Sequence, residues 1–101
     1  MELSYSSNKL EKQLTQDKVM RRDYSEPWVK KIRLRIAELR AADNLEELQE
    51  GPGRWHALKG DRAGEWAGDV SGNYRMIITP NTDGPVFQAT AVRIEKIADY
   101  H

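Results

Sequence analysis

The chain has 101 residues, with 16 basic and 16 acidic side chains, 39% hydrophobic residues and no cysteine. This length fits one domain with a modest core, and the lack of cysteine excludes a disulfide scaffold and zinc–cysteine sites. Zero net charge argues against a strongly attractive field for nucleic acid. No apolar run reaches the roughly 18 residues of a membrane helix. Because no signal peptide is visible either, we expect one domain over residues 1–101 in a reducing cytoplasm, away from membranes.

The charges are unevenly spread along the chain. Residues 9–40 hold ten bases against five acids, a net charge of +5, and four acids without a base follow between residues 43 and 50. The basic segment has two interpretations. It is either a solvated helix face or a surface that contacts phosphates or an acidic protein.

The first half of the chain has mainly helical periodicity. Residues 2–5 alternate as a short edge strand does, and residues 8–20 form a moderately amphipathic helix. A second helix is predicted from a cap at Ser25 to about Ala42, with Pro27 in its first turn. Leu34 falls opposite its apolar stripe, and one further turn spans residues 45–49. The stripe covers an arc of about 100° and consists of Trp28, Val29, Ile32, Ile36 and Leu39.

The second half of the chain changes to a period of two. Gly51-Pro52-Gly53 ends the helical part, and residues 64–70, 74–79 and 86–97 are predicted strands. A hairpin turn at residues 71–73 and a longer loop at 80–85 join them into an antiparallel sheet. The helices must bury their stripe on one face of this sheet, so we predict a two-layer α+β domain whose other face is free to carry a site.

Few residue types in this chain can carry chemistry. There is no serine elbow or cysteine nucleophile, no paired-carboxylate signature and only two histidines, so we expect no metal or other cofactor. What remains is a cationic set with a Tyr-His terminus. Each member has a plain alternative as a solvated surface group, but Arg75 lies in an apolar strand, where a cation rarely sits without a partner. The set comprises His56, Lys59, Arg62, Arg75 and the pair Tyr100-His101.

This cationic set suits an anionic substrate and phosphoryl chemistry without a metal. Cleaving RNA needs a base for the 2′-hydroxyl proton, positive charge for the transition state and an acid for the departing 5′-oxygen. Histidine suits both proton transfers because its pKa lies near neutrality. Lysine and arginine hold developing negative charge, arginine through a bidentate fork.

Three segments occur together in order: Leu58-Lys59-Gly60-Asp61-Arg62-Ala63-Gly64-Glu65-Trp66, then Asn73-Tyr74-Arg75-Met76-Ile77, then Asp99-Tyr100-His101. As a set they resemble the HigB branch of the RelE/ParE superfamily, the toxins of bacterial type II toxin–antitoxin modules. The glycine-proline turn before His56 fits the same branch. The likeness covers residues 51–79 and 94–101, and the helical half matches only in layout.

The resemblance implies a RelE-like fold, in which two N-terminal helices pack on a small twisted antiparallel sheet. It also implies a metal-independent endoribonuclease that cuts mRNA on a translating ribosome and thereby inhibits translation. The partner would be a HigA-like helix-turn-helix antitoxin, through which alone the complex would contact operator DNA.

By the same resemblance, catalysis would rest on His56, Lys59, Arg75 and His101. Lys59 and Arg75 would hold the phosphate and the charge of the transition state. His56 and His101 would share proton transfer, with the order of acid and base left open. Three further residues would contact the substrate, namely Arg54, Arg62 and Tyr100.

The chain departs from the HigB pattern in its neutral charge, in its longer loop and strand after Ile78, and in Tyr74, where tryptophan is common. Two alternatives stay open: a ParE-like toxin that inhibits gyrase by binding, and a non-catalytic relative that only binds an antitoxin. The nuclease hypothesis predicts that the four distant cationic groups meet in one pocket. The antitoxin is expected on the helical half, through its basic face or Leu34.

Overall fold

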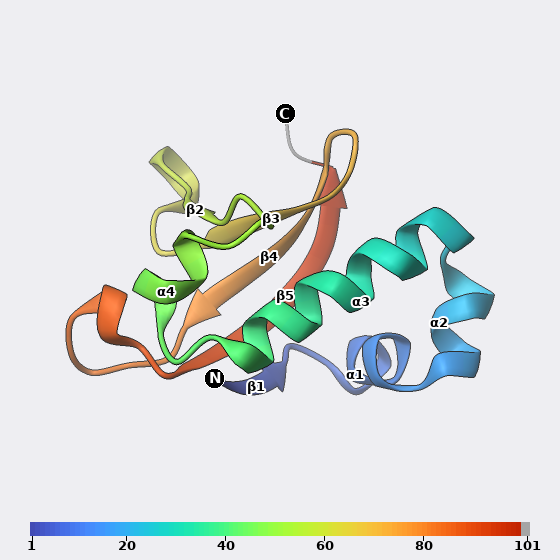
Figure 1. Cartoon of the computed structure of the whole chain (residues 1–101), viewed down its shortest axis with the longest axis horizontal. Coiled ribbons are helices and arrows are strands. Elements are labelled where there is room, and N and C mark those ends of the chain that lie inside the picture. Colours follow the sequence, from blue (N-terminus) through green and yellow to red (C-terminus); the bar gives the residue numbers. More distant parts are fainter. Residues whose placement is uncertain (100–101) are drawn as a thin grey trace.

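In the computed structural model, which describes residues 1–99, helices cover one face of a five-stranded sheet (Figure 1). The helices are α1 (Asn8–Thr15), α2 (Asp17–Asp23), α3 (Glu26–Ala41) and α4 (Leu45–Gln49). The strands are β1 (Glu2–Tyr5), β2 (His56–Ala57), β3 (Trp66–Ser71), β4 (Tyr74–Pro80) and β5 (Ala91–Asp99). Two short 3-10 helices, η1 (Gly60–Arg62) and η2 (Val86–Gln88), lie in loops. The α+β class predicted from the sequence is confirmed.

Helix α3 forms where the sequence predicts it, and it lies across the sheet (Figure 1). Ser25 occupies the N-cap position, although its side chain makes no capping hydrogen bond. The apolar stripe is buried except for Trp28, which is half-buried, and Leu34 is 50% exposed, as expected. The unexpected feature is Arg35, a charged residue on the buried side with an exposure of only 5%.

The single helix predicted over residues 8–20 is wrong. The structure has two helices that part at Gln16, whose backbone is extended (φ −106°, ψ 115°). The Thr15 hydroxyl donates to the Glu11 carbonyl oxygen (2.6 Å), a local bond that satisfies an acceptor near the end of α1. The change of direction lets Leu14 and Met20, on different helices, both reach the core.

The strands β3, β4 and β5 pair antiparallel as predicted, but the sheet as a whole is mixed rather than antiparallel. Its order is β1-β5-β4-β3-β2, and β1 pairs with β5 in parallel, which the long connection between them permits. Strand β5 starts at Ala91 rather than Val86, because residues 86–88 form η2 instead. The short strand β2 was not predicted at all, and it adds an edge beside β3.

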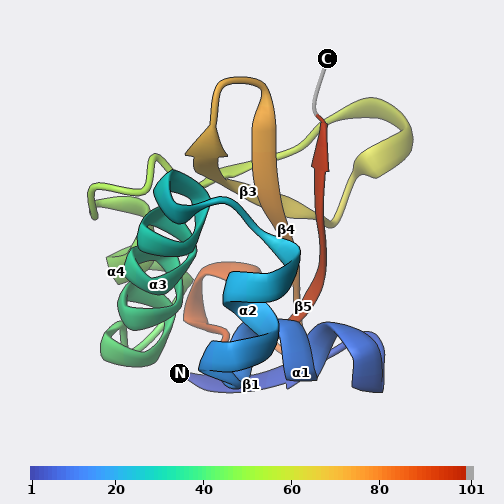
Figure 2. The ribbon, with the colours of Figure 1, turned by 90° about the vertical axis from the view of Figure 1, so that its right-hand side faces the viewer.

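Alternation along the strands divides the core between the two faces of the sheet. The larger cluster lies under the helices and includes Met76 and Ile78 of β4. A smaller cluster forms on the opposite face, which we call the open face, and consists of Leu58, Ala67 and Ile77 with Ala98 packed against it. The segment around residues 58–65 lies on the side of the sheet away from α3 (Figure 2). No helix within residues 1–99 is both long and apolar enough to cross a membrane.

Candidate functional site

The open face receives Arg75 because of the period of two along β4. Met76 and Ile78 point into the helix-covered core, whereas Ile77 belongs to the open-face cluster. Arg75, two residues before Ile77, therefore shares the open face. Its side chain is 22% exposed, although its Nε is buried.

An acidic partner holds the Arg75 side chain in place. Asp69 on β3 is the register partner of Arg75, and its Oδ1 lies 2.9 Å from Arg75 Nε. Arg75 also donates from Nη1 to the carbonyl oxygens of Gly72 (2.6 Å) and Tyr74 (3.1 Å). Arg54 approaches the same carboxylate from the other side, with its Nε 3.6 Å from Asp69 Oδ2. One carboxylate thus brings two of the predicted cations together.

A buried network on the helix side fixes the strand position of Asp69. Arg35 of α3 donates from Nε to the Asp69 carbonyl oxygen (2.7 Å) and forms an ion pair with Glu38. Glu38 Oε1 in turn accepts hydrogen bonds from Gly53 N (2.8 Å) and from Trp55 Nε1 (3.2 Å). The network therefore ties α3 both to β3 and to the segment that leads into β2.

Arg54 has a strained backbone. Its φ of 56° lies in the left-handed region, which costs an L-residue about 1–2 kcal/mol. Its neighbours enforce this conformation: Gly53 O accepts from Asp69 N (2.9 Å), and Trp55 is buried. A Cβ on Gly68 would lie 2.7 Å from the Trp55 ring, so only glycine admits this packing. Such outliers cluster at functional sites, and this one presents a cation to Asp69.

His56 lies on the open face as the register partner of Ala67. Its Nδ1 is 2.9 Å from the Arg54 carbonyl oxygen, which can only accept a hydrogen bond. In the neutral ring, this contact is compatible with the tautomer that carries its proton on Nδ1 and leaves Nε2 as the acceptor. From strand spacing and rise, the Cα atoms of His56 and Arg75 lie roughly 12 Å apart.

Lys59 and Arg62 reach the open face through the loop after β2. Leu58 packs on Ala67 and Ile77, and its backbone nitrogen donates to Glu65 O (2.8 Å), which closes the loop. Lys59 is exposed at the start of η1, and Arg62 is half-buried within it. Tyr100 and His101 lie outside the described residues, so their place in the site stays a prediction.

At its other end, the open face carries a separate polar group around Glu95. Its Oε2 accepts from Thr79 Oγ1 (2.5 Å) and from Arg93 Nε (2.6 Å). Burial alone would raise the pKa of Glu95, but these hydrogen bonds and the charge of Arg93 outweigh burial, and the pKa is lowered. Arg93 is the register partner of Thr79, and Thr79 lies four residues after Arg75 on β4. The Cα atoms of Arg75 and Thr79 are therefore about 13 Å apart.

Sequence reasoning missed the acidic member of this site. The predicted turn at residues 71–73 contained the signal, because pairing outward from a three-residue turn places Asp69 opposite Arg75. The burial of Arg35 had a signal too, because Arg35 falls within 20° of Trp28 at the edge of the apolar stripe and Glu38 is its i,i+3 neighbour. Within residues 1–99, no group of three or more histidine, aspartate or glutamate residues is placed to hold a metal ion.

Comparison with known proteins gives a clear result for the fold. No family model and no curated protein matches the sequence. A YoeB/ParE toxin from Agrobacterium tumefaciens matches in structure with a TM-score of 0.66 and 18% identity, over 100% of both chains. A YoeB–YefM complex and a YoeB dimer from Staphylococcus aureus match with TM-scores of 0.64 and 0.62 and identities of 18% and 19%, each over 100% of this chain and 97% of the other.

The chain has the fold of these toxins. The match extends over both the helical layer and the sheet, since every residue of the chain is covered. At these identities the likeness concerns the fold, and the chemistry must be argued from the side chains.

Proposed function

We propose that this protein is the toxin of a toxin–antitoxin module. In this proposal it cleaves mRNA on the ribosome, without a metal ion. The proposal is supported by the fold shared with toxins named YoeB. The observation that carries it is the group on the open face, where Arg54 and Arg75 meet at Asp69 and His56 lies two strands from Arg75.

In this proposal the arginines bind the scissile phosphate. A guanidinium offers two parallel donors to a phosphate, and its contact with Asp69 and two carbonyl oxygens keeps Arg75 oriented before substrate arrives. The phosphate competes with the carboxylate for this fork. Lys59, at the rim of the same face, adds charge for the transition state.

Proton transfer falls to the histidines. One imidazole takes the 2′-hydroxyl proton, the 2′-oxygen attacks phosphorus, and the 5′-oxygen leaves with a proton from the second imidazole, giving a 2′,3′-cyclic phosphate and a 5′-hydroxyl. The contact between His56 and the Arg54 carbonyl presents Nε2 as a base in the neutral ring. His101 is the second histidine of the proposal, with Tyr100 and Arg62 among the substrate contacts.

The partner in this proposal is an antitoxin. One structural neighbour is described as YoeB in complex with YefM, which supports a protein partner for this fold. The sequence motifs favour the HigB branch and hence a HigA-like, helix-turn-helix antitoxin. We place the toxin in the cytoplasm, where mRNA and ribosomes are, and we assign contact with operator DNA to the antitoxin.

The test is cleavage of a defined message on purified ribosomes, with the 5′ ends of the fragments mapped. Arg75→Ala should lower the cleavage rate by about 100-fold or more, since it removes preorganised positive charge. Arg75→Lys should recover only part of the rate, because it keeps the charge but loses the fork. Arg93→Ala is the matched control on the same face, and it should cleave as the parent does.

Three results would contradict the proposal. If Arg75→Ala and His56→Ala cut the message as fast as the parent, the open face is not the catalytic site. If messages stay intact while DNA supercoiling by gyrase stops, the protein is a gyrase inhibitor instead. If neither activity is present and expression leaves growth unaffected, a non-catalytic antitoxin-binding protein is the better description.

A further inference from the structure

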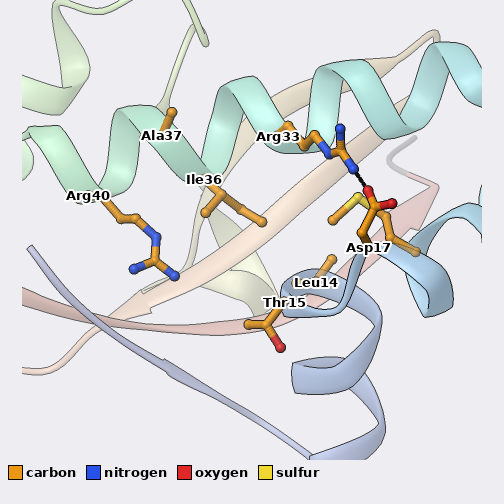
Figure 3. Close-up of a pocket in the computed structure, with 8 residues that line it drawn as sticks. Leu14, Thr15, Asp17, Arg33, Ile36, Ala37 and Arg40 are labelled. Carbon is orange, nitrogen blue, oxygen red and sulfur yellow. Dashed lines mark ion pairs between the residues drawn. The ribbon is translucent and has the colours of Figure 1, made fainter.

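The helical half carries a groove that the proposed nuclease site does not use. A hollow of about 270 Å³ lies between α1, α2 and α3, on the opposite layer from Arg75 (Figure 3). Its lining is partly apolar and partly polar or charged. The apolar part consists of Leu14, Met20, Ile36 and Ala37, and the polar or charged part of Thr15, Asp17, Arg33 and Arg40.

A second hollow continues the groove toward the start of α3. It is lined by Glu26, Val29, Lys30, Leu34 and by Arg33, the residue that it shares with the first hollow. Along α3 the groove follows residues 26, 30, 33, 37 and 40, which fall within an arc of about 80° at 100° per residue. This stripe is about 21 Å long, the length of four helical turns.

The groove has an excess of positive charge that its own acids do not neutralise. Its two acids are already engaged: Asp17 pairs with Arg21 and Arg33, and Glu26 also pairs with Arg21. Within residues 1–99, neither Lys30 nor Arg40 forms an ion pair. Beside Lys30, the apolar side chain of Leu34 is 50% exposed.

We propose that this groove binds an acidic amphipathic helix of a partner protein. Charge complementarity selects the sign of the partner, because carboxylates along the ligand would meet Lys30 and Arg40, neither of which pairs with an acid of the described chain. Its apolar side chains at every third and fourth position would pack on Leu34 and into the hollow above Ala37.

The walls of the groove select a helix rather than an extended strand. All the wall residues come from helices, whose backbone groups are already hydrogen-bonded within each helix. An extended segment would find no strand edge for its own backbone groups here, whereas a helix satisfies them internally. A ligand of about 15 residues matches the length of the stripe. Naming this partner as the antitoxin rests on the proposed function, but the groove itself does not.

Binding of synthetic peptides tests the proposal without any measurement of nuclease activity. The probe is a fluorescein-labelled helical peptide of about 15 residues, with leucine at every third and fourth position and glutamate and alanine elsewhere. A twin with lysine in place of glutamate controls for non-specific apolar binding. The full chain should bind the acidic peptide, more weakly as salt rises, and should not bind the basic twin.

Matched variants locate the binding surface. Lys30→Glu and Arg40→Glu should each weaken binding of the acidic peptide by about tenfold, as loss of a charge pair of about 1.4 kcal/mol does. Lys31→Glu is the control, because Lys31 lines a different hollow on the opposite flank of α3 with Pro27 and Asp69. Ala37→Trp should block the hollow, whereas Ala41→Trp, outside both hollows, should not.

Several outcomes would overturn the proposal. These are no binding of the acidic peptide, equal binding of its basic twin, or equal losses with Lys30→Glu and Lys31→Glu. Competition by a single-stranded RNA of the same charge would make the groove a general polyanion site. A concentration-dependent dimer that Arg40→Glu dissolves would make a second copy the occupant. Peptide binding without mRNA cleavage would support the groove as a binding site and contradict only the proposed function.

Discussion

The two faces of the sheet hold their arginine–carboxylate pairs in different surroundings. Under the helices, the side chains of Arg35 and Glu38 are 6% and 15% exposed, whereas those of Arg75 and Asp69 on the open face are 22% and 30% exposed. Both arginines reach the same strand residue. Arg35 binds the carbonyl oxygen of Asp69, and Arg75 binds its carboxylate.

This difference separates a structural pair from one that can exchange partners. Breaking a buried pair leaves a charge without water or partner, which is strongly unfavourable. A pair that water reaches is worth much less, so an incoming anion can replace its carboxylate. Asp69 is thus positioned from the helix side, while Arg75 can exchange its carboxylate for an anion on the open face.

The largest effect should come from breaking the buried pair. Glu38→Ala removes the partner of Arg35 and the acceptor for Gly53 N and Trp55 Nε1. We expect the free energy of unfolding to fall by about 3–5 kcal/mol, a large share of the stability of a small domain. Urea denaturation followed by tryptophan fluorescence measures this loss.

The control for Glu38→Ala is Asp69→Asn, which breaks the pair on the open face. Its effect on the free energy of unfolding should be about 1 kcal/mol or less. Equal losses in the two variants would mean that both pairs are structural, and the contrast between the faces would disappear.

The second prediction concerns the strained backbone of Arg54. Arg54→Gly relieves the positive φ and should raise the free energy of unfolding by about 1 kcal/mol, while the loss of its cation lowers the rate of mRNA cleavage. Arg54→Ala separates the two effects, since it removes the cation but keeps the Cβ that makes this conformation unfavourable. A cleavage rate unchanged in both variants would remove Arg54 from the site.

The sequence predicted the parts of the fold that local pattern determines. The stripe of α3 and the turn at residues 71–73 were both found, because periodicity and glycine chemistry are local signals. The break at Gln16 was not found, since no glycine or proline marks it in the sequence. The parallel pairing of β1 with β5 joins distant segments, and no local pattern encodes it.

The same limit applies to the candidate site. Arg75 stood out because a cation within an apolar strand must emerge on one face, and it does so on the open face. Asp69 was overlooked because a single acid in a strand reads as a solvated side chain until the register pairs it with Arg75. The pair of Arg35 and Glu38 lies within α3, but its contacts with Asp69 of β3 and with the segment before β2 arise only from the tertiary fold.

A smaller effect should follow from adjusting the exchangeable pair. Asp69→Asn removes the carboxylate that competes with phosphate for Arg75 and Arg54, so binding of an anion should tighten by about fivefold, equivalent to about 1 kcal/mol. Fluorescence anisotropy with a 2′-O-methyl oligonucleotide, which cannot be cleaved, measures this affinity. Asp83→Asn makes the same change of charge in a distant loop and controls for the overall field. An equal gain in anion affinity in both variants would show that the Asp69 carboxylate does not specifically compete for Arg75.

The smallest predicted effect is a pH-dependent contribution to stability at the end of the open face that carries Glu95. Because the pKa of Glu95 is lowered in the folded protein, its ionised form contributes stability above the ordinary value of 4.5, and this contribution is lost as the pH falls through the lowered pKa. Glu95→Gln should therefore be less stable than the parent at neutral pH, and the two should converge in acid below pH 4.5.

Unfolding in urea at a series of pH values measures the difference, with Glu50→Gln, an exposed residue, as the control. A gap that stays constant into acid would mean that Glu95 stabilises this end by shape and not by charge. Thr79 and Arg93 would then be neighbours of Glu95 without electrostatic effect.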